Sequence, residues 1–320
     1  MVPSGNGEAR PYLTLVFTGR NDDFGGDFNG RFFRALRFNH DRLAAAGIPH
    51  EFVFVEWRPI PNKPYLATLL ASEFPQLGPS ELRSFVVDAA YHDALSLNRR
   101  LQFQEFIAKN VGIRRARGEY VLTTNTDIYL SRGVIDYLAA RALQPDVLYR
   151  AARHDLKGHI DASCMDWDLL EDERNWEIVN PIKPPYYTNA SGDFLLLDSL
   201  ASHRLRGFNE IYRTAKIHMD GNFCVKAHAS RIQLVDIGAP VYHVGRGTLH
   251  AQIGSYRDKP AEAPWGDIRW NSDVIYINGD NWGLGAAPER RLDDRTTVLT
   301  FDWSTVAPMV ELRRVVLPAR

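Results

Sequence analysis

Four clusters of polar side chains each follow an apolar, strand-like run in this 320-residue chain. They are Thr18–Asp23, Glu56-Trp57, Asn125–Asp127 and His243. In an open parallel sheet, ligands bind at the carboxyl ends of the strands, so these side chains are candidates for a shared site. Mg²⁺ prefers oxygen ligands, and Mn²⁺ also accepts imidazole nitrogen. Asp127 with a distant His243 therefore predicts a divalent cation site, and such a cation would neutralise a diphosphate. For Asp127 taken alone, a turn or helix N-cap role stays open.

The elements that would position these clusters alternate along the chain. Short β-branched or aromatic runs are followed by helical periodicity, as in Phe103, Ile107 and Val111. This alternation is typical of βαβ units, and it predicts an α/β fold with a mostly parallel central sheet flanked by helices. The character changes near residue 155, and the tail from Gly254 shows little periodicity. We expect strands at 12–17, 52–55, 84–87, 120–123, 147–149, 194–197, 232–235 and 240–243.

The composition is that of an ordinary folded chain, with 45% hydrophobic and 24% charged residues, which excludes disordered and coiled-coil classes. Thirty-eight basic and 39 acidic residues give a net charge of -1, so there is no global basic field to hold nucleic acid. Two cysteines, Cys164 and Cys224, cannot form a disulfide framework, and the first ten residues lack an apolar stretch. We therefore expect a cytoplasmic protein. No apolar run approaches the roughly 20 residues of a membrane span.

Three consecutive stretches, Glu105–Ile113, Ala116–Leu122 and Asn125–Asp127, form a helix, a strand and a polar turn in the predicted order. Together they resemble the core of GT-A fold, family-2-like nucleotide-sugar glycosyltransferases, and Asn125–Asp127 stands where that family has its DxD metal motif. Gly207–Glu210 is similar to the family's G-F-D-E, and Met219-Asp220 stands at its E-D pair. The resemblance implies a GT-A-like (Rossmann-like) domain at 11–253 and a C-terminal extension at 254–320. Within the domain, the nucleotide-binding half would be 11–155 and the acceptor half 156–253.

The resemblance also implies an activity and roles for single residues. The protein would move a sugar from a nucleoside-diphosphate sugar to the hydroxyl of a carbohydrate or another acceptor, with inversion and with Mn²⁺ or Mg²⁺. Asp127 and His243 would bind the metal, Asp220 would be the catalytic base, and Asp193 is the second choice for the base. Ser191 and Gly192 would line the donor sugar and the acceptor. The donor nucleotide would contact Thr18, Gly19, Arg20, Asn21, Glu56, Lys109, Asn110, Asn125 and Thr126.

Two positions depart from the family pattern. Asn125 replaces the first aspartate of DxD, which leaves Asp127 as the direct ligand. Restoring aspartate at position 125 should then leave metal binding unchanged or make it tighter. Met219 replaces the family's glutamate, so Asp220 must carry the base role alone. The segment after Gly254 has no counterpart in the family, and an acceptor-side role and the formation of a homo-oligomer are both open to it.

Other interpretations remain open at this stage. The chain could be a non-catalytic sugar- or nucleotide-binding module on the same fold. It could also be a nucleotidyltransferase, although a glycine-rich basic triphosphate loop is missing near the first strand. Lys109 and Asn110 could be packing or capping residues, and Asp220 could be a helix N-cap.

Some motifs look functional but have a simpler explanation. Asp166-Trp167-Asp168 is a formal DxD, yet it lies in an acidic run after no buried strand, so we expect a solvated face. Trp265, Trp270 and Trp282 could stack on sugar, but burial against the domain is the expected role. His250 is a reserve metal ligand if His243 is structural.

Overall fold

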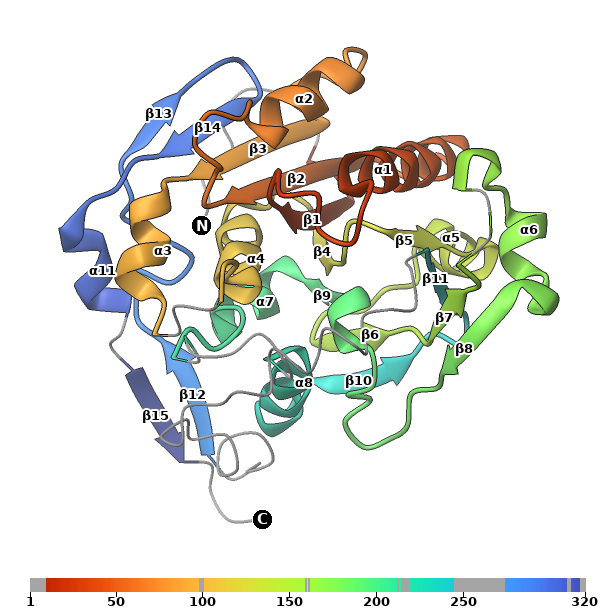
Figure 1. Ribbon diagram of the computed structural model, residues 1–320. Helices are drawn as coiled ribbons and strands as arrows, with labels where there is room; N and C mark the ends of the chain where they lie inside the picture. The colour runs from red at the N-terminus through yellow and green to blue at the C-terminus, as the bar shows by residue number, and fades with distance from the viewer. Residues whose placement is uncertain are drawn as a thin grey trace.

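The computed structural model describes residues 10–97, 101–158, 160, 162–211, 213, 219–244, 274–309 and 312–316. In this part of the chain the largest element is a nine-stranded sheet with the order β10-β6-β9-β4-β1-β2-β3-β14-β13 (Figure 1). Its strands are β1 (Leu13–Gly19), β2 (His50–Trp57), β3 (Leu82–Val87), β4 (Tyr120–Thr123), β6 (Val147–Arg150), β9 (Leu195–Asp198), β10 (Gln233–Asp236), β13 (Glu289–Arg291) and β14 (Thr296–Leu299).

Most neighbouring strands in this sheet run parallel. The exceptions are β9, which is antiparallel to both β4 and β6, and β13, which is antiparallel to β14 at the edge. The strands β4, β1, β2, β3 and β14 form one parallel block. The predicted α/β fold with a mostly parallel central sheet flanked by helices is therefore confirmed.

Alternating side chains of the central strands feed two separate cores. Leu13, Leu15 and Phe17 of β1 pack with α1 (Phe28–Ala45), α2 (Leu66–Glu73) and α5 (Arg132–Ala139). On the opposite face, Val16 and Val55 pack with α3 (Ala89–Leu95), α4 (Glu105–Arg115), α7 (Ser199–Leu205) and α8 (Met219–Ala229). Figure 1 shows α1 and α4 on opposite sides of β1 and β2. Burial on both faces explains why these strands read as continuous apolar runs.

One glycine has a packing role that the sequence does not reveal. Gly118 lies between α4, which ends at Arg115, and β4, which begins at Tyr120. A side chain at Gly118 would come within 2.6 Å of the backbone nitrogen of Thr14. The glycine therefore allows the entry to β4 to approach β1 closely.

A four-stranded sheet stands beside the central one, in the order β5-β11-β7-β8 (Figure 1). It consists of β5 (Ile128–Leu130), β11 (Val241–His243), β7 (Arg153–Leu156) and β8 (Trp176–Asn180), and α6 (Trp167–Glu171) lies nearby. The register sets His243 beside Asp155 on one neighbour and Ile128 on the other. The strand expected at 240–243 thus belongs to this second sheet, where it lies next to the segment that carries Asp127.

The tail contains more regular structure than its weak periodicity indicates. Its described part includes β12 (Val274–Asn278), β13, β14, α11 (Trp303–Met309) and β15 (Leu312–Val316). The strand β14 joins the central sheet beside β3, and Trp282 is only 4% exposed within the second core. Trp265, Trp270 and His250 lie outside the described residues, and the predicted domain boundary at 253 stays a prediction. Across the described residues, we find no helix whose length and apolar character would let it cross a membrane.

Candidate functional site

Three of the four predicted polar clusters lie at the carboxyl ends of strands in the central sheet, and His243, on the second sheet, faces Asp127. In the sheet, β1 lies between β2, the next strand along the chain, and β4. The carboxyl ends of β1 and β4 therefore mark a point where the strand order reverses, which is where open α/β sheets bind ligands. Thr18 and Gly19 end β1, Glu56 is near the end of β2, and Asn125 follows β4.

The turn after β1 is fastened to the loop after β2. The Asn21 side-chain amide donates to the Pro64 carbonyl at 3.0 Å, and the Lys63 ammonium donates to the Asn21 carbonyl at 3.1 Å. Arg20 donates to the carbonyl of Arg58 at 2.9 Å. These contacts hold two loops of the predicted nucleotide site together.

Gly19 lies where a side chain would collide with its surroundings. An added Cβ would come within 2.9 Å of the Phe28 ring and 3.2 Å of the Phe54 ring. Thr18, its neighbour, is 7% exposed. The end of β1 is therefore packed closely against Phe28 of α1 and Phe54 of β2, with no room for a side chain at position 19.

Glu56 is buried at the end of β2, and only one of its carboxylate oxygens has a partner. Oε2 accepts from the backbone nitrogen of Ala67 at 3.0 Å, at the start of α2. Oε1 is buried with no hydrogen-bond partner. Burial raises the pKa of Glu56 to about 7, although hydrogen bonds from Ala67 and Leu66 act in the opposite direction. The unpartnered oxygen is an acceptor to which a ligand could donate.

Asp127 and His243, the predicted metal ligands, face each other. His243 Nε2 lies 3.5 Å from Asp127 Oδ2, and its Nδ1 lies 2.6 Å from Asp155 Oδ1. Asp155 also accepts from Arg153 and from Asn180. The carboxylate of Asp155 thus orients the imidazole so that Nε2 points at Asp127, an arrangement that metal-binding histidines commonly show.

Asp127 and His243 each stabilise the charged form of the other. Burial alone would disfavour the ionised form of Asp127, but the attraction of His243 and Arg31 lowers its pKa to about 2. Burial likewise opposes the charge on His243, but Asp127 and Asp155 raise its pKa to about 10. Both side chains are about one-seventh exposed, at 16% and 14%. The site therefore holds strong opposite charges near its surface.

The donor set fits a small divalent cation with two protein ligands. Two ligands of an octahedral ion lie roughly 3 Å apart, given bonds of about 2.1 Å, so 3.5 Å requires only a small adjustment. A carboxylate oxygen with an imidazole nitrogen suits Mn²⁺. In the described part of the chain, no group of three or more His, Cys, Asp or Glu side chains could hold a metal. Substrate phosphate oxygens and water would supply the other positions, as is usual for such ions.

Arg31, which the sequence analysis did not select, also contacts Asp127. Its guanidinium NH1 lies 2.6 Å from Asp127 Oδ2, the same oxygen that His243 faces. Arg31 belongs to the first turn of α1, so its position next to a strand end nearly one hundred residues later depends on the packing of α1 against the sheet. No local sequence signal marks it.

Asn125 has two partners that explain why it is not an aspartate. Its Oδ1 accepts from the Lys109 ammonium at 2.9 Å, and its Nδ2 donates to Asp193 Oδ1 at 2.6 Å. An amide can accept and donate at once, whereas a carboxylate can only accept. The expectation that aspartate at position 125 would be harmless or beneficial for metal binding did not include this contact and needs correction.

Lys109 is a buried support for the site. It is fully buried, pairs with Glu105 at 3.0 Å, and donates to the Gly192 carbonyl at 3.0 Å as well as to Asn125. Its three N–H donors are therefore matched by three acceptors of this chain. The packing alternative fits Lys109 better than the predicted donor contact.

Asn110 also lies below the site. It is fully buried, and its amide nitrogen donates to the Phe208 carbonyl and to Glu210. Its amide oxygen accepts from the Phe208 nitrogen. The geometry again favours packing, and it places the G-F-N-E segment against α4. Thr126, the neighbour of Asp127, is 6% exposed.

The two candidate bases, Asp193 and Asp220, differ in their exposure and in their hydrogen-bond partners. Asp193 is 2% exposed, with Oδ1 bound by Asn125 and Oδ2 paired to Arg153 at 2.7 Å. Asp220 is partly exposed and uses Oδ2 to accept from Ser191 at 2.9 Å and from the Gly192 nitrogen at 2.7 Å. Asp220 lies within α8 and not at an N-cap. Of the two residues, Asp220 is the more exposed.

A buried arginine holds the turn that carries these residues. Arg150 is fully buried and donates to the carbonyls of Tyr187, Asn189, Ser191 and Phe194. The 3₁₀ turn η3 (Ser191–Asp193) is therefore fixed from below. Arg150 is the last residue of β6. The neighbouring residues in the sequence do not indicate its contacts with the distant turn.

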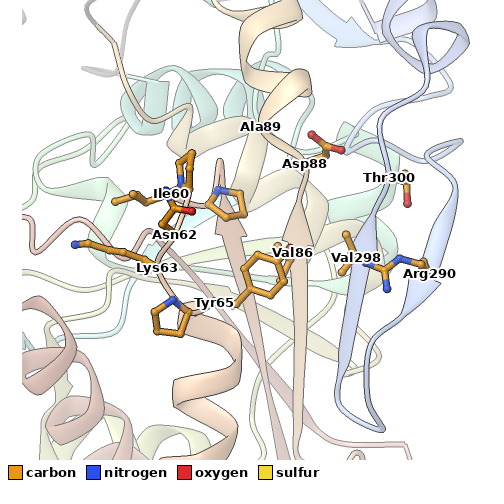
Figure 2. Close-up of a pocket in the computed structure, with 13 residues that line it drawn as sticks. Ile60, Asn62, Lys63, Tyr65, Val86, Asp88, Ala89, Arg290, Val298 and Thr300 are labelled. Atoms are coloured by element: carbon orange, nitrogen blue, oxygen red, sulfur yellow. The ribbon is translucent and has the colours of Figure 1, made fainter.

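A separate cavity of about 590 Å³ opens at the same edge of the sheet, beyond β3 (Figure 2). None of the predicted site residues lines it. Its lining comes from the loop after β2, the end of β3 with the start of α3, and the tail, as Figure 2 shows for Lys63, Asp88 and Arg290. Lys63 and Pro64 also contact Asn21, so the cavity adjoins the nucleotide turn.

The competing DxD behaves as expected. Asp166 caps α6 by accepting from the Leu169 nitrogen, and the side chain of Asp168 is 94% exposed. This acidic run is a solvated helix face.

Comparison with known proteins gives likenesses in structure only. No protein-family model matches the chain. No curated protein matches it either. Among solved structures, the catalytic domain of Drosophila β1,4-galactosyltransferase 7 in complex with xylobiose is similar, with 12% identity and a TM-score of 0.41 over 93% of this chain and 98% of that one. A mutant of the Drosophila protein, solved with manganese, UDP-Gal and xylobiose, has a TM-score of 0.40 at 12% identity, over 92% of this chain and 97% of that one.

Staphylococcus aureus TarS 1–349 is also similar. It has 14% identity and a TM-score of 0.41, over 72% of this chain but only 60% of that one. The same protein in complex with UDP-GlcNAc has a TM-score of 0.40 at 13% identity, over 73% of this chain and 58% of that one. Because these identities and scores are low, the function proposed below rests on this chain's own residues.

Proposed function

We propose that this protein is a metal-assisted glycosyltransferase that uses a nucleoside-diphosphate sugar. The observation that carries the proposal is the meeting of Asp127, His243 and Asp193 around the carboxyl end of β4, with Asp220 against the adjoining turn. These side chains come from separate segments of the sequence, with His243 on the second sheet and Asp220 on α8. A carboxylate and an imidazole that would bind a cation, together with the partly exposed Asp220, would suit the transfer of a group from a diphosphate to a hydroxyl.

The nucleoside would lie across the ends of β1 and β2. The turn at Thr18–Asn21 borders one side, and the unpartnered Oε1 of Glu56 offers an acceptor for a ribose hydroxyl or a base N–H. Because β2 lies between β1 and β3, the nucleoside would extend toward the cavity beyond β3. The predicted contacts of Thr18, Gly19, Arg20 and Asn21 belong to this part of the proposal.

The diphosphate would lie over Asp127 and His243, which would hold Mn²⁺ or Mg²⁺. When bound, the cation would act as a Lewis acid that stabilises the leaving phosphate. The chain itself contributes a fixed imidazole orientation through Asp155, and Lys109 fixes Asn125 and the Gly192 carbonyl from below.

The acceptor would approach over Ser191 and Gly192. Asp220 is the proposed general base, because it is partly exposed, whereas both oxygens of Asp193 are taken by Asn125 and Arg153. The carboxylate would receive the hydroxyl proton as the acceptor oxygen attacks the anomeric carbon, which inverts the configuration. Ser191 and the Gly192 nitrogen hold Asp220 in place for this step.

A panel of nucleotide sugars tests the proposal directly. The protein is incubated with each sugar nucleotide, with and without Mn²⁺, and free nucleoside diphosphate is measured. Slow release that depends on Mn²⁺ is expected for a transferase, because water can replace the acceptor. A non-catalytic binding module would release none, and a nucleotidyltransferase would instead form sugar phosphate when given pyrophosphate.

Variants assign the roles in the same assay. Asp127→Ala should abolish Mn²⁺-dependent donor binding, whereas Asp168→Ala, an exposed aspartate in the competing DxD, should change little. Asp220→Asn should lower transfer by about 10²–10⁴-fold with donor affinity nearly unchanged. Near-normal turnover in Asp220→Asn would refute the base, and a product with retained configuration would refute the inverting reaction.

A further inference from the structure

Arg31 is built into the proposed cation site. NH1 lies 2.6 Å from Asp127 Oδ2, and both side chains are largely shielded, at 14% and 16% exposed. NH2 donates to the Phe24 carbonyl at 2.6 Å, and Nε donates to the Gly26 carbonyl at 3.1 Å. Each guanidinium nitrogen therefore has an acceptor within this chain, and two of the three acceptors are backbone carbonyls of the loop after β1.

The loop is shaped to receive the guanidinium. Gly25 and Gly26 both have positive φ, at 76° and 78°, a conformation that favours glycine. A side chain at Gly25 would come within 2.9 Å of Arg31 NH2. Two consecutive glycines thus allow the loop to wrap around Arg31, so the contact with Asp127 is part of a larger arrangement and not an isolated surface ion pair.

Arg31 and a divalent cation would require the same oxygen. His243 Nε2 lies 3.5 Å from Asp127 Oδ2, so a cation shared by the two residues approaches the oxygen that Arg31 already occupies. A guanidinium and a divalent ion also repel each other in a partly buried place, where screening is weak. A divalent cation on that oxygen would therefore weaken its contact with Arg31.

We propose that Arg31 competes with the divalent cation for Asp127 Oδ2, and that cation binding thereby releases the loop at 20–27 from Asp127. The inference rests on the proposed function only in placing the cation at Asp127. Arg31 sets the affinity for the cation, and the loop that borders the donor nucleotide responds when the cation arrives. Arg31 is a positioning residue in this scheme, because it acts on the donor loop and on Asp127 and takes no part in the transfer of the sugar.

Calorimetric titration of the full chain with MnCl₂ alone tests the competition. Arg31→Gln should tighten Mn²⁺ binding by about tenfold, because it removes a charge-assisted contact and a repulsive charge. The matched control is Arg34→Gln, on the same helix, where Arg34 pairs with the exposed Asp27. Arg34→Gln should stay within about twofold of the wild type. An Arg31→Gln affinity equal to or weaker than that of the wild type would overturn the proposal.

The variant Asp127→Asn tests the cation site separately from the competition with Arg31. If this variant loses Mn²⁺ binding and Arg31→Gln does not tighten it, the cation site stands and only the competition is wrong. If Asp127→Asn binds Mn²⁺ as the wild type does, the cation site is wrong and the competition is wrong with it. If the wild type binds too weakly to measure, measurable binding in Arg31→Gln supports the proposal, and its absence overturns the proposal.

A second measurement needs no variant at Arg31. Hydrogen exchange of the wild type is followed with and without saturating MnCl₂. Amides in the 20–31 segment, including that of Gly26, which donates to the Asp23 carbonyl, should exchange faster when Mn²⁺ is present. Unchanged or slower exchange in this segment would overturn the link between the cation and the loop.

Discussion

Asn125 shows how one amide can connect two parts of a site. It bridges Lys109 and Asp193, and the 2.6 Å contact with Asp193 requires a donor at that position. The DxD pattern alone indicates a missing charge at position 125. The structure instead shows an amide that accepts from Lys109 and donates to Asp193 at once.

This contact reverses the expected effect of Asn125→Asp. A carboxylate at position 125 would face Asp193 without a donor between them, so we expect the free energy of unfolding to fall by about 1–3 kcal/mol. Mn²⁺ affinity should not improve, because the new charge is engaged by Lys109 beneath the site. Urea unfolding and calorimetry measure both effects. A variant that is as stable as the wild type and binds Mn²⁺ more tightly would contradict this account of Asn125.

Glu56 should make stability depend on pH. Burial raises its pKa to about 7 from an ordinary value of 4.5, so the folded state holds a proton that the unfolded state has lost between these values. The stabilising contribution is full below pH 4.5 and is lost as pH rises through about 7. The loss should be roughly 3 kcal/mol, at about 1.4 kcal/mol per unit.

Glu56→Gln tests this dependence, because the amide keeps the shape but does not ionise. Urea unfolding of the variant should vary less between pH 4.5 and 8 than that of the wild type. Nucleotide affinity is the second measurement, since an unpartnered Oε1 that accepts from the donor predicts weaker binding in the variant. Parallel pH curves for the two proteins would mean that Glu56 is ionised throughout this range in the folded state.

At the scale of elements, strand register creates the cation site. The strand β11 places His243 beside Asp155 of β7 and beside Ile128 of β5, next to Asp127. Because side chains alternate along a strand, Arg153 and Asp155 share the face that His243 occupies. His154 and Tyr242 turn to the opposite face, where their rings contact Trp176.

Asp155 is therefore expected to matter without touching the cation. Asp155→Ala should weaken Mn²⁺ binding by about 10–100-fold, because His243 would lose the partner that fixes its ring. Asp155→Asn keeps an acceptor for Nδ1 and should lose less. Calorimetry with MnCl₂ compares the two variants with the wild type. Wild-type affinity in Asp155→Ala would show that the imidazole is oriented by other contacts.

The sequence could predict the elements but not all of their partners. Strand and helix periodicity located the central sheet, and the clusters after strands located Asp127 and His243, because these signals are local. Asp220 was selected only through the family resemblance. Arg31, Arg150 and Arg153 were missed, since their roles arise only when α1, β6 and β7 pack against distant segments. Lys109 and Asn110 lie on α4 as expected, but their burial depends on the turn at 207–210, which the sequence does not position.

At the scale of the molecule, the described part of the tail packs into the second core, on the α4 face of the central sheet. Leu299 of β14 is fully buried beside Val87 of β3. Arg115 donates to the carbonyls of Gly283 and Leu284 and pairs with Glu289. These contacts tie the described tail to α4 and the central sheet.

Leu299→Ala should accordingly destabilise the whole protein. The expected cost is about 2–5 kcal/mol, the range for a buried leucine, and unfolding should stay a single transition. Leu292→Ala, at a residue that is 42% exposed, is the control and should change little. Chemical unfolding followed by fluorescence and by circular dichroism would detect a separate early transition, which would mean that the tail folds independently.

The position of β14 beside β3 has a consequence for biosynthesis. The strand partners Ser84 and Thr296 are more than two hundred residues apart, so most of the chain leaves the ribosome before β3 gains its second neighbour. Until then, the backbone groups on that side of β3 have no strand to pair with, and such edges invite pairing with other chains. Contacts between such distant residues also form slowly. The interval before β14 is synthesised is therefore when this protein most needs protection from self-association, and nascent chains that stop before β14 should be the ones that chaperones retain.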